Sequence, residues 1–248
     1  MKSLMLAAGL ARRLYGGENT ELPKALLTFG GESLLCRHIT ILLECGIEEL
    51  FIVVGHRSGD LISEAKRVAP SNFVKFIHNP RYREGPILSL ECGSEVLRAG
   101  CPVIFMDADT LYHPNILRRL VKSGHNNCLV LDREFQSTDD FVKVCLRDGQ
   151  VVDFGKNLSG SYDLVGEWPG FMKMSPEIAT KVADEAGQIV SSGEVEGAYE
   201  RAIQAVLHNE AIGTFGFEDI TGMPWIEIDY ESDLKKATLE IIPRISKY

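Results

Sequence analysis

The stretch that decides the fold is residues 4–24, which opens Leu4-Met5-Leu6-Ala7-Ala8-Gly9-Leu10-Ala11-Arg12-Arg13-Leu14 and ends, after a polar run, in Leu22-Pro23-Lys24. An apolar run too short for a helix gives way to small residues and two arginines, which predicts a strand, a tight loop and a basic helix start. Backbone N–H groups in the loop can close on an anion, and the helix contributes its positive end. Full charges would come from Arg12, Arg13 and Lys24, so we predict a phosphate-binding loop.

The scarcity of glycine in this loop excludes two common kinds of phosphate-binding loop. Gly9 is the only glycine before Gly16, so the stretch is neither a Walker A loop nor the three-glycine dinucleotide fingerprint. Taken alone, the two arginines could form a solvated helix face, and Lys24 could be an ordinary surface lysine. Their position beside a small-residue loop favours phosphate binding.

The composition predicts one acidic domain with enough apolar residues for a continuous hydrophobic core. The chain has 248 residues, 45% of them apolar, and a formal net charge of −9. This charge argues against a nucleic-acid-binding surface, which needs a basic excess. We therefore expect a local basic pocket in an acidic protein, with a divalent cation beside it.

The cysteines and the N-terminus predict a cytoplasmic protein. The six cysteines form no Cys-x-x-Cys pair, and reduced, buried thiols are the simplest expectation. The first apolar run is shorter than a signal-peptide core, and no run approaches the ~18 apolar residues of a membrane span.

Strand-like and helical runs alternate along the chain, which predicts an α/β fold with an open, mostly parallel mixed sheet sandwiched by helices. After residue 132 an antiparallel hairpin, 142–146 with 151–154, is inserted around Asp148-Gly149, which suits a type I′ turn. We predict one domain, 1–248, in which 1–131 form the nucleotide-binding core and 132–248 form the acceptor side and closing segment. The loosest stretch is 187–196. Further strands are expected at 50–54, 73–77, 103–106, 128–131, 170–174, 214–217 and 225–228, and helices at 33–44, 60–68, 87–98, 115–123, 176–186, 197–209 and 233–242.

Carboxylates follow two of these strands. Asp107 and Asp109 end the strand at 103–106, where open α/β sheets place their ligands, although Asp is also common where a strand simply turns. Asp229 could be the N-cap of the last helix or a metal ligand. Glu227 alternates with Asp229 and is expected on the same side of its strand.

With the opening loop, Pro23-Lys24 and Asp107-Ala108-Asp109 in view, the chain resembles the sugar-phosphate-type nucleotidyltransferases over nearly its whole length. In that family the loop matching residues 6–14 wraps the triphosphate, and an arginine matching Arg13 contacts it. A lysine matching Lys24 neutralises charge at the α-phosphate. An aspartate matching Asp109 binds Mg²⁺, and a second aspartate near the C-terminus completes the metal site. The resemblance thus implies a Mg²⁺ cofactor and catalytic roles for Arg13 and Lys24.

Trp225-Ile226-Glu227-Ile228-Asp229 is similar to a segment of the cytidylyltransferases that act on phosphocholine, inositol 1-phosphate and aminoethylphosphonate. This resemblance implies that Asp229 is the second metal ligand. The chain departs from this branch at Arg12, where a small hydroxyl residue is usual, and at Gly85-Pro86, where an asparagine beside the base is usual. Proline has no N–H group to offer a base. The nucleotide-binding residues implied are Leu6, Ala7, Ala8, Gly9, Arg12, Arg13, Asn79, Gly85, Ser89 and Asp107.

Candidates for the acceptor pocket come from the second half of the chain. An alcohol or amine headgroup would need carboxylates or an aromatic face, whereas a buried indole or an exposed hairpin lysine is common without any such role. The candidates are Lys143, Lys156, Glu167, Trp168, Glu200 and Glu227.

The implied reaction is Mg²⁺-dependent transfer of an NMP, CMP from CTP first, to a small phosphorylated alcohol, polyol or phosphonate, with release of pyrophosphate. A sugar 1-phosphate nucleotidyltransferase using UTP, dTTP or GTP is the alternative within this class. A nucleotide-cofactor oxidoreductase and a non-catalytic nucleotide-binding subunit are alternatives of another class. The run Val53-Val54-Gly55-His56-Arg57 counts against the oxidoreductase, because it lacks an acidic residue at the end of its strand.

Overall fold

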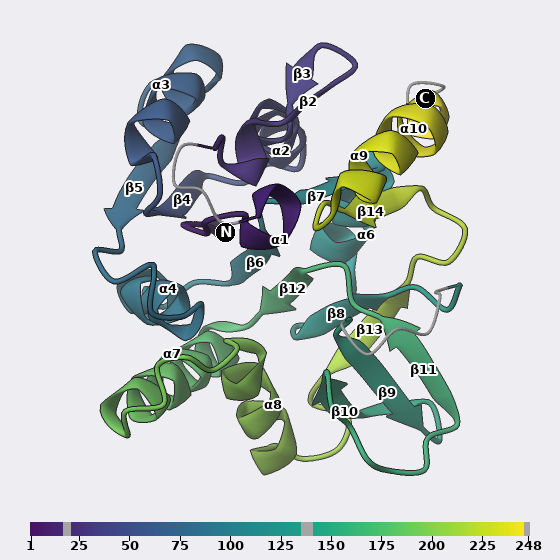
Figure 1. Cartoon of the computed structure of the whole chain (residues 1–248). Helices are drawn as coiled ribbons and strands as arrows, with labels where there is room; N and C mark the ends of the chain where they lie inside the picture. Colours follow the sequence, from purple (N-terminus) through teal and green to yellow (C-terminus); the bar gives the residue numbers. More distant parts are fainter. Residues whose placement is uncertain (17–20, 135–140, 246–248) are drawn as a thin grey trace.

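The structure is a computed structural model, and it describes residues 1–16, 21–134 and 141–245. A seven-stranded sheet runs through the molecule in the order β13-β8-β12-β6-β1-β4-β5 (Figure 1). β12 runs antiparallel to both neighbours, whereas the other neighbouring strands in this sheet are parallel. The strands are β1 (Lys2–Ala7), β4 (Glu49–Val54), β5 (Val74–His78), β6 (Val103–Asp107), β8 (Cys128–Leu131), β12 (Phe171–Met174) and β13 (Gly216–Asp219).

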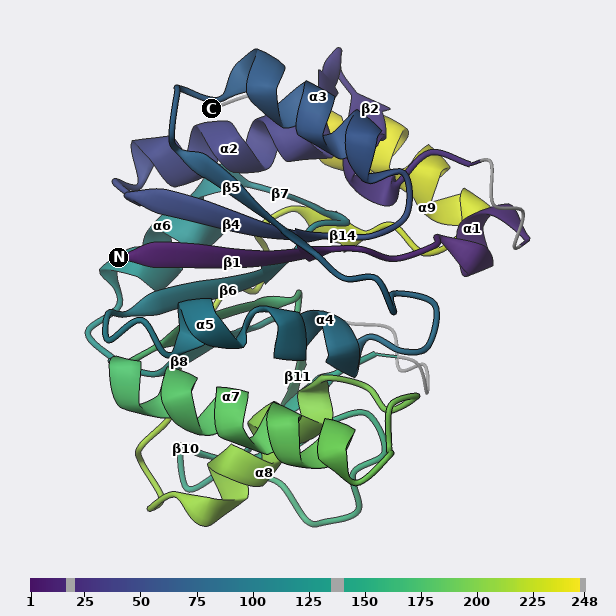
Figure 2. The same ribbon diagram turned by 90° about the vertical axis from the view of Figure 1, so that its left-hand side faces the viewer.

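Helices cover both faces of this sheet, which confirms the predicted fold class (Figure 2). On one face lie α2 (Leu34–Glu44), α3 (Ser58–Val68) and α6 (Pro114–Lys122), and on the other α4 (Ile87–Cys92), α5 (Ser94–Leu97) and α7 (Pro176–Ser191). Because both faces are covered, the central strands are almost wholly apolar and buried.

Polar residues at the helix starts explain where several of these helices begin. The Ser33 hydroxyl accepts a hydrogen bond from the Cys36 N–H, and the Ser175 hydroxyl accepts one from the Ile178 N–H. Both α6 and α7 also carry proline at the first helical position, where no N–H is needed.

Three smaller sheets complete the fold. The predicted hairpin is present, and its Asp148 and Gly149 have φ of 50° and 73°, as a type I′ turn requires. A third strand joins it, so the antiparallel insertion is a sheet in the order β10-β9-β11, against which α8 packs. The elements are β9 (Lys143–Arg147), β10 (Gln150–Gly155), β11 (Leu164–Glu167), α8 (Glu200–Asn209), and the ribbons β7 (Thr110–Tyr112) with β14 (Trp225–Glu227) and β2 (Thr28–Phe29) with β3 (Glu32–Ser33).

The remaining helical segments lie near the ends of the chain. The opening loop leads into the single turn α1 (Arg12–Tyr15), and the 3₁₀ turn η1 (Lys24–Leu26) follows. The closing helix is α9 (Glu231–Lys236), the π-helical turn η2 (Ala237–Ile241) and α10 (Ile242–Ile245). It packs through Ala237 and Ile241 on a small core of its own with Ile228, Phe29 and Leu34.

Two sequence predictions about helices are wrong. α7 continues to Ser191, so the first half of 187–196 is helix rather than loose chain, because the buried Ile189 extends the apolar face past Gly187. The helix predicted over 87–98 is broken at Gly93, where a Cβ would lie 2.6 Å from the Leu4 side chain. The break lets the backbone pack directly on β1.

Two further observations concern the compartment. All six cysteines are free thiols; Cys128 and Cys145 are buried and the other four are partly buried. Among the residues that the structure describes, no helix is long and apolar enough to cross a membrane. The predicted cytoplasmic location stays a prediction.

Candidate active site

A cavity of about 1020 Å³ lies beyond the carboxyl ends of β1 and β6, two adjacent parallel strands in which Leu6 is in register with Asp107. The order of the strands reverses between β1 and β6, because β4 and β5 follow on one side of β1 and β6 lies on the other. Ligands of open α/β sheets bind in the crevice at such a switch point. The predicted residues that line the cavity are Leu6, Ala8, Gly9, Arg12, Arg13, Lys24, Gly85, Ser89, Asp107, Asp109, Lys156, Glu200 and Glu227.

Six predicted residues lie elsewhere or at the edge. Ala7 lines a small adjoining cavity beside Lys24, and Trp168 and Asp229 line another beside Asp107. Asn79 lines none of these cavities: its side-chain amide donates to the Ser89 hydroxyl and accepts from the Arg81 N–H, so it ties the start of the loop after β5 to α4. Lys143 and Glu167 face each other across β9 and β11, and neither lines these cavities.

The opening loop presents its charges to the cavity. Ala11 adopts a left-handed conformation, with φ of 53°, and α1 begins directly after it. Arg12 and Arg13 both line the cavity, and Arg13 forms an ion pair of 2.9 Å with Asp229. The loop therefore brings its backbone and two guanidinium groups to the cavity, as an anion site requires.

Three carboxylates converge beside this loop. One oxygen each from Asp109, Glu227 and Asp229 lies within 4.8 Å of the other two. Asp109 follows β6, and Glu227 ends β14, which pairs with β7 immediately after Asp109. Glu227 lies beside Asp229, as the sequence alternation predicts, and the acceptor role predicted for Glu227 stays a prediction. An all-oxygen, carboxylate-rich donor set of this size fits Mg²⁺.

Lys24 is the cation closest to the cluster. Its ammonium lies 3.0 Å from Asp109 Oδ2 and 2.6 Å from Asp229 Oδ1. Burial disfavours the charged form, but the charges of Asp109 and Asp229 outweigh it and raise the pKa of Lys24. The lysine is therefore fully charged at neutral pH.

Two other carboxyl groups are held partly desolvated. Burial, followed by the charge of Asp109, raises the pKa of Asp107 well above its ordinary range, although the Tyr199 hydroxyl donates a hydrogen bond to Asp107. Although Glu227 presents surface to the cavity, desolvation and the charges of Asp109 and Asp229 raise its pKa in the same direction. Desolvation and mutual repulsion thus disfavour ionisation of these carboxyl groups, and a bound cation would relieve the repulsion.

Sequence reasoning missed one wall of the cavity. Tyr82, Arg83 and Glu84 lie on it, opposite Val195 and Glu196 from the segment after α7. A Cβ on Gly85 would lie 1.9 Å from the Val195 carbonyl oxygen, so glycine allows the two segments to meet. No periodicity or motif signals this contact, because the two segments are about a hundred positions apart.

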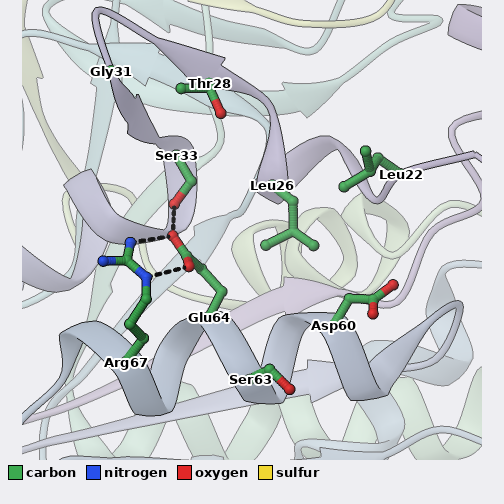
Figure 3. A pocket seen from close by; sticks show the side chains of 9 residues that line it. All are labelled: Leu22, Leu26, Thr28, Gly31, Ser33, Asp60, Ser63, Glu64 and Arg67. Carbon is green, nitrogen blue, oxygen red and sulfur yellow. Dashed lines mark hydrogen bonds and ion pairs between the residues drawn. The ribbon is translucent and has the colours of Figure 1, made fainter.

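A second hollow of about 440 Å³ lies on the opposite side of η1, between α3 and the β2–β3 ribbon (Figure 3). Leu26 lines it, whereas Lys24 lines the larger cavity. Its charges are mutually satisfied, because Glu64 accepts hydrogen bonds from both Ser33 and Arg67. The chemistry-bearing groups therefore gather in the larger cavity.

Comparisons with known proteins agree with this geometry. The chain is 28% identical over 236 residues to the bifunctional IPC transferase and DIPP synthase of Rubrobacter xylanophilus, covering 93% of this chain and 50% of that protein. It is 23% identical over 259 residues to the CMP-5'-(3-aminopropyl)phosphonate synthase of Streptomyces rubellomurinus, covering 98% and 39% respectively. The chain thus spans half or less of the length of these curated relatives.

Solved structures share the fold. The CTP:phosphocholine cytidylyltransferase from Streptococcus pneumoniae superposes with a TM-score of 0.74 at 24% identity, covering 95% of this chain and 96% of that one. The inositol-1-phosphate CTP transferase from T. maritima gives a TM-score of 0.74 at 18% identity, covering 99% and 96%. The architecture is therefore the Rossmann-like nucleotide-diphospho-sugar transferase fold. Residues 3–158 match the model of the MobA-like NTP transferase domain, and the chain belongs to that family.

Proposed function

We propose that this protein is a Mg²⁺-dependent cytidylyltransferase that joins CMP from CTP to a small phosphorylated alcohol, polyol or phosphonate and releases pyrophosphate. The observation that carries the proposal is the meeting of Arg12, Arg13 and Lys24 with a three-carboxylate cluster at one strand edge. The family supports nucleotide transfer, and the names of the two curated relatives support CMP and a phosphorylated or phosphonate acceptor.

The reaction needs little covalent chemistry from the protein. An acceptor oxygen attacks the α-phosphorus of the nucleotide, the new P–O bond forms, and the bond between the α-phosphorus and the bridging oxygen breaks as pyrophosphate leaves. Both reactants are anions, so positioning and charge neutralisation are the main tasks. A bound Mg²⁺ would supply a Lewis acid that neutralises phosphate charge.

We assign roles to the chain's own residues from their places in the cavity. The backbone at 7–9 and the guanidinium groups of Arg12 and Arg13 hold the β- and γ-phosphates. Lys24 neutralises charge at the α-phosphate, and Asp109, Glu227 and Asp229 hold the metal. Lys156 lines the same cavity near the buried Glu200, and we assign it to the acceptor phosphate.

A grid of substrates tests this function. Pyrophosphate release is measured with each of four NTPs against phosphocholine, aminoethylphosphonate, inositol phosphate and hexose 1-phosphates, with Mg²⁺ and with EDTA. We expect turnover with CTP and a non-hexose acceptor, and its loss in EDTA. Turnover confined to hexose 1-phosphates with UTP, dTTP or GTP would establish the alternative, and no turnover in the whole grid would refute the proposal.

A further inference from the structure

The ammonium of Lys24 lies where the carboxylate cluster would receive a cation. Its nitrogen contacts Asp109 and Asp229 simultaneously, at 3.0 and 2.6 Å. All three side chains are largely enclosed, with 14% of the Lys24 side chain, 23% of Asp109 and 15% of Asp229 exposed. Two short contacts in an enclosed site make this a strong charge-assisted interaction rather than a loose surface pair.

The backbone holds Lys24 at this position. It is the first residue of η1, the preceding Pro23 has its φ set by the ring, and the following Ala25 is buried in the core. The side chain therefore starts from an anchored turn and extends toward the carboxylates. Arg13 adds a second contact to Asp229 from the other side.

The same two carboxylates belong to the metal donor set described above. The Lys24 ammonium lies 2.6 Å from a carboxylate oxygen of Asp229. A Mg²⁺ ion bound to the same carboxylate at about 2.0–2.1 Å would be crowded and repelled by this ammonium. Lys24 also lines the large cavity next to Gly9, so its flexible side chain has room to turn toward the opening loop. The lysine could thus leave the two carboxylates for a phosphate bound at the opening loop.

We propose that Lys24 acts as an internal counter-cation that competes with the divalent metal for Asp109 and Asp229, so the free protein binds the metal only when this ammonium withdraws. The inference rests on the proposed metal site. It adds that the lysine assigned to the α-phosphate also weakens metal binding before substrate arrives.

Metal binding without nucleotide tests the competition. Mn²⁺ is titrated by electron paramagnetic resonance into the full chain at pH 8, for the wild type and for Lys24→Met, Lys24→Gln and Lys24→Arg. Lys181→Met is the control, because it removes a lysine that pairs with Glu177 and Glu210 instead of with the three carboxylates. Circular dichroism checks that each variant is folded.

We expect Lys24→Met and Lys24→Gln to bind Mn²⁺ on the order of tenfold more tightly than wild type, since removing the competitor frees two charge-assisted contacts. Lys24→Arg and Lys181→Met should stay close to wild type. Mg²⁺ should also raise the melting temperature of Lys24→Met more than that of wild type, because the cation replaces the lost ammonium.

Opposite results overturn the inference. If Lys24→Met and Lys24→Gln bind Mn²⁺ no more tightly than wild type, or if no variant binds Mn²⁺, Lys24 does not compete with a metal. A wild-type protein that still transfers CMP would then keep the proposed function while losing this inference. Tighter Mn²⁺ binding by Lys24→Met and Lys24→Gln, with no transferase activity of the wild type in any substrate combination, would support this inference and refute the proposed function.

Discussion

Asp109 contacts Lys24 at 3.0 Å and shares it with Asp229, which lies closer. Replacing Asp109 by Asn removes one charge from the proposed metal site but leaves Lys24 with its other partner. We expect turnover to fall roughly 10²–10³-fold, as for other losses of transition-state charge stabilisation. The free energy of unfolding should change by about 1 kcal/mol or less. Pyrophosphate release and urea denaturation measure the two effects.

Asp184→Asn is the control for this variant. Asp184 pairs with Arg98 on the surface, where an ion pair contributes little to stability. Neither turnover nor stability should change. A collapse of the Asp109→Asn melting temperature with unchanged residual activity would instead assign Asp109 a purely structural role.

Glu167 gives the protein a pH-dependent stability term. Burial, followed by the charge of Asp132, raises the pKa of Glu167 to about 7. The folded state therefore holds this proton more tightly than the unfolded state, so the stabilising contribution is present at low pH and is lost as pH rises toward and through 7. We expect Glu167→Gln to be more stable than wild type at pH 8, with the difference shrinking toward pH 5. Equal differences at the two pH values, measured by urea denaturation, would contradict this.

At the scale of elements, the turn before β12 supports the site. Gly170 has φ of 90°, and a Cβ there would lie 2.8 Å from Asp107 Oδ2. Gly170→Ala should therefore combine left-handed backbone strain with a clash that displaces the carboxylate bound by Tyr199.

The variant Gly222→Ala measures the backbone strain without the steric clash. Gly222 has φ of 82°, but nothing lies within 4 Å of a Cβ built there. We expect Gly222→Ala to lose about 1–2 kcal/mol from strain alone and Gly170→Ala to lose roughly 1–3 kcal/mol more. Chemical denaturation compares them, and equal losses would show that Asp107 moves aside without cost.

At the scale of the whole molecule, the seven-stranded sheet draws strands from both halves of the chain. β12 and β13, from the predicted acceptor side, flank β8, and β12 also pairs with β6 of the predicted nucleotide core. A core that ends at residue 131 would leave the edge of β6 without its partner. The halves therefore share one hydrophobic core rather than forming separate units.

We predict a single cooperative unfolding transition. Both tryptophans, Trp168 and Trp225, lie in the second half, so their fluorescence reports on 132–248 while far-ultraviolet circular dichroism reports on the whole chain. The two urea transitions should coincide. Separate midpoints would show that the halves unfold independently.

Local patterns were sufficient for much of this protein. Apolar runs predicted most of the strands and the parallel fold class, and Asp148-Gly149 predicted the hairpin turn. The prediction missed short strands, such as residues 164–167 and 110–112. Three or four residues carry too little periodicity to indicate a strand, and these strands form only by pairing with other segments of the chain.

The sequence by itself determined the fold class, the phosphate-type loop and the identity of the acidic residues, because these depend on side-chain type and local spacing. Tertiary structure decided how those residues meet: Glu227 beside Asp109, the Lys24 ammonium between Asp109 and Asp229, and Gly85 against Val195. Such contacts join segments up to two hundred positions apart. They follow from strand order and loop packing, which a local pattern does not encode.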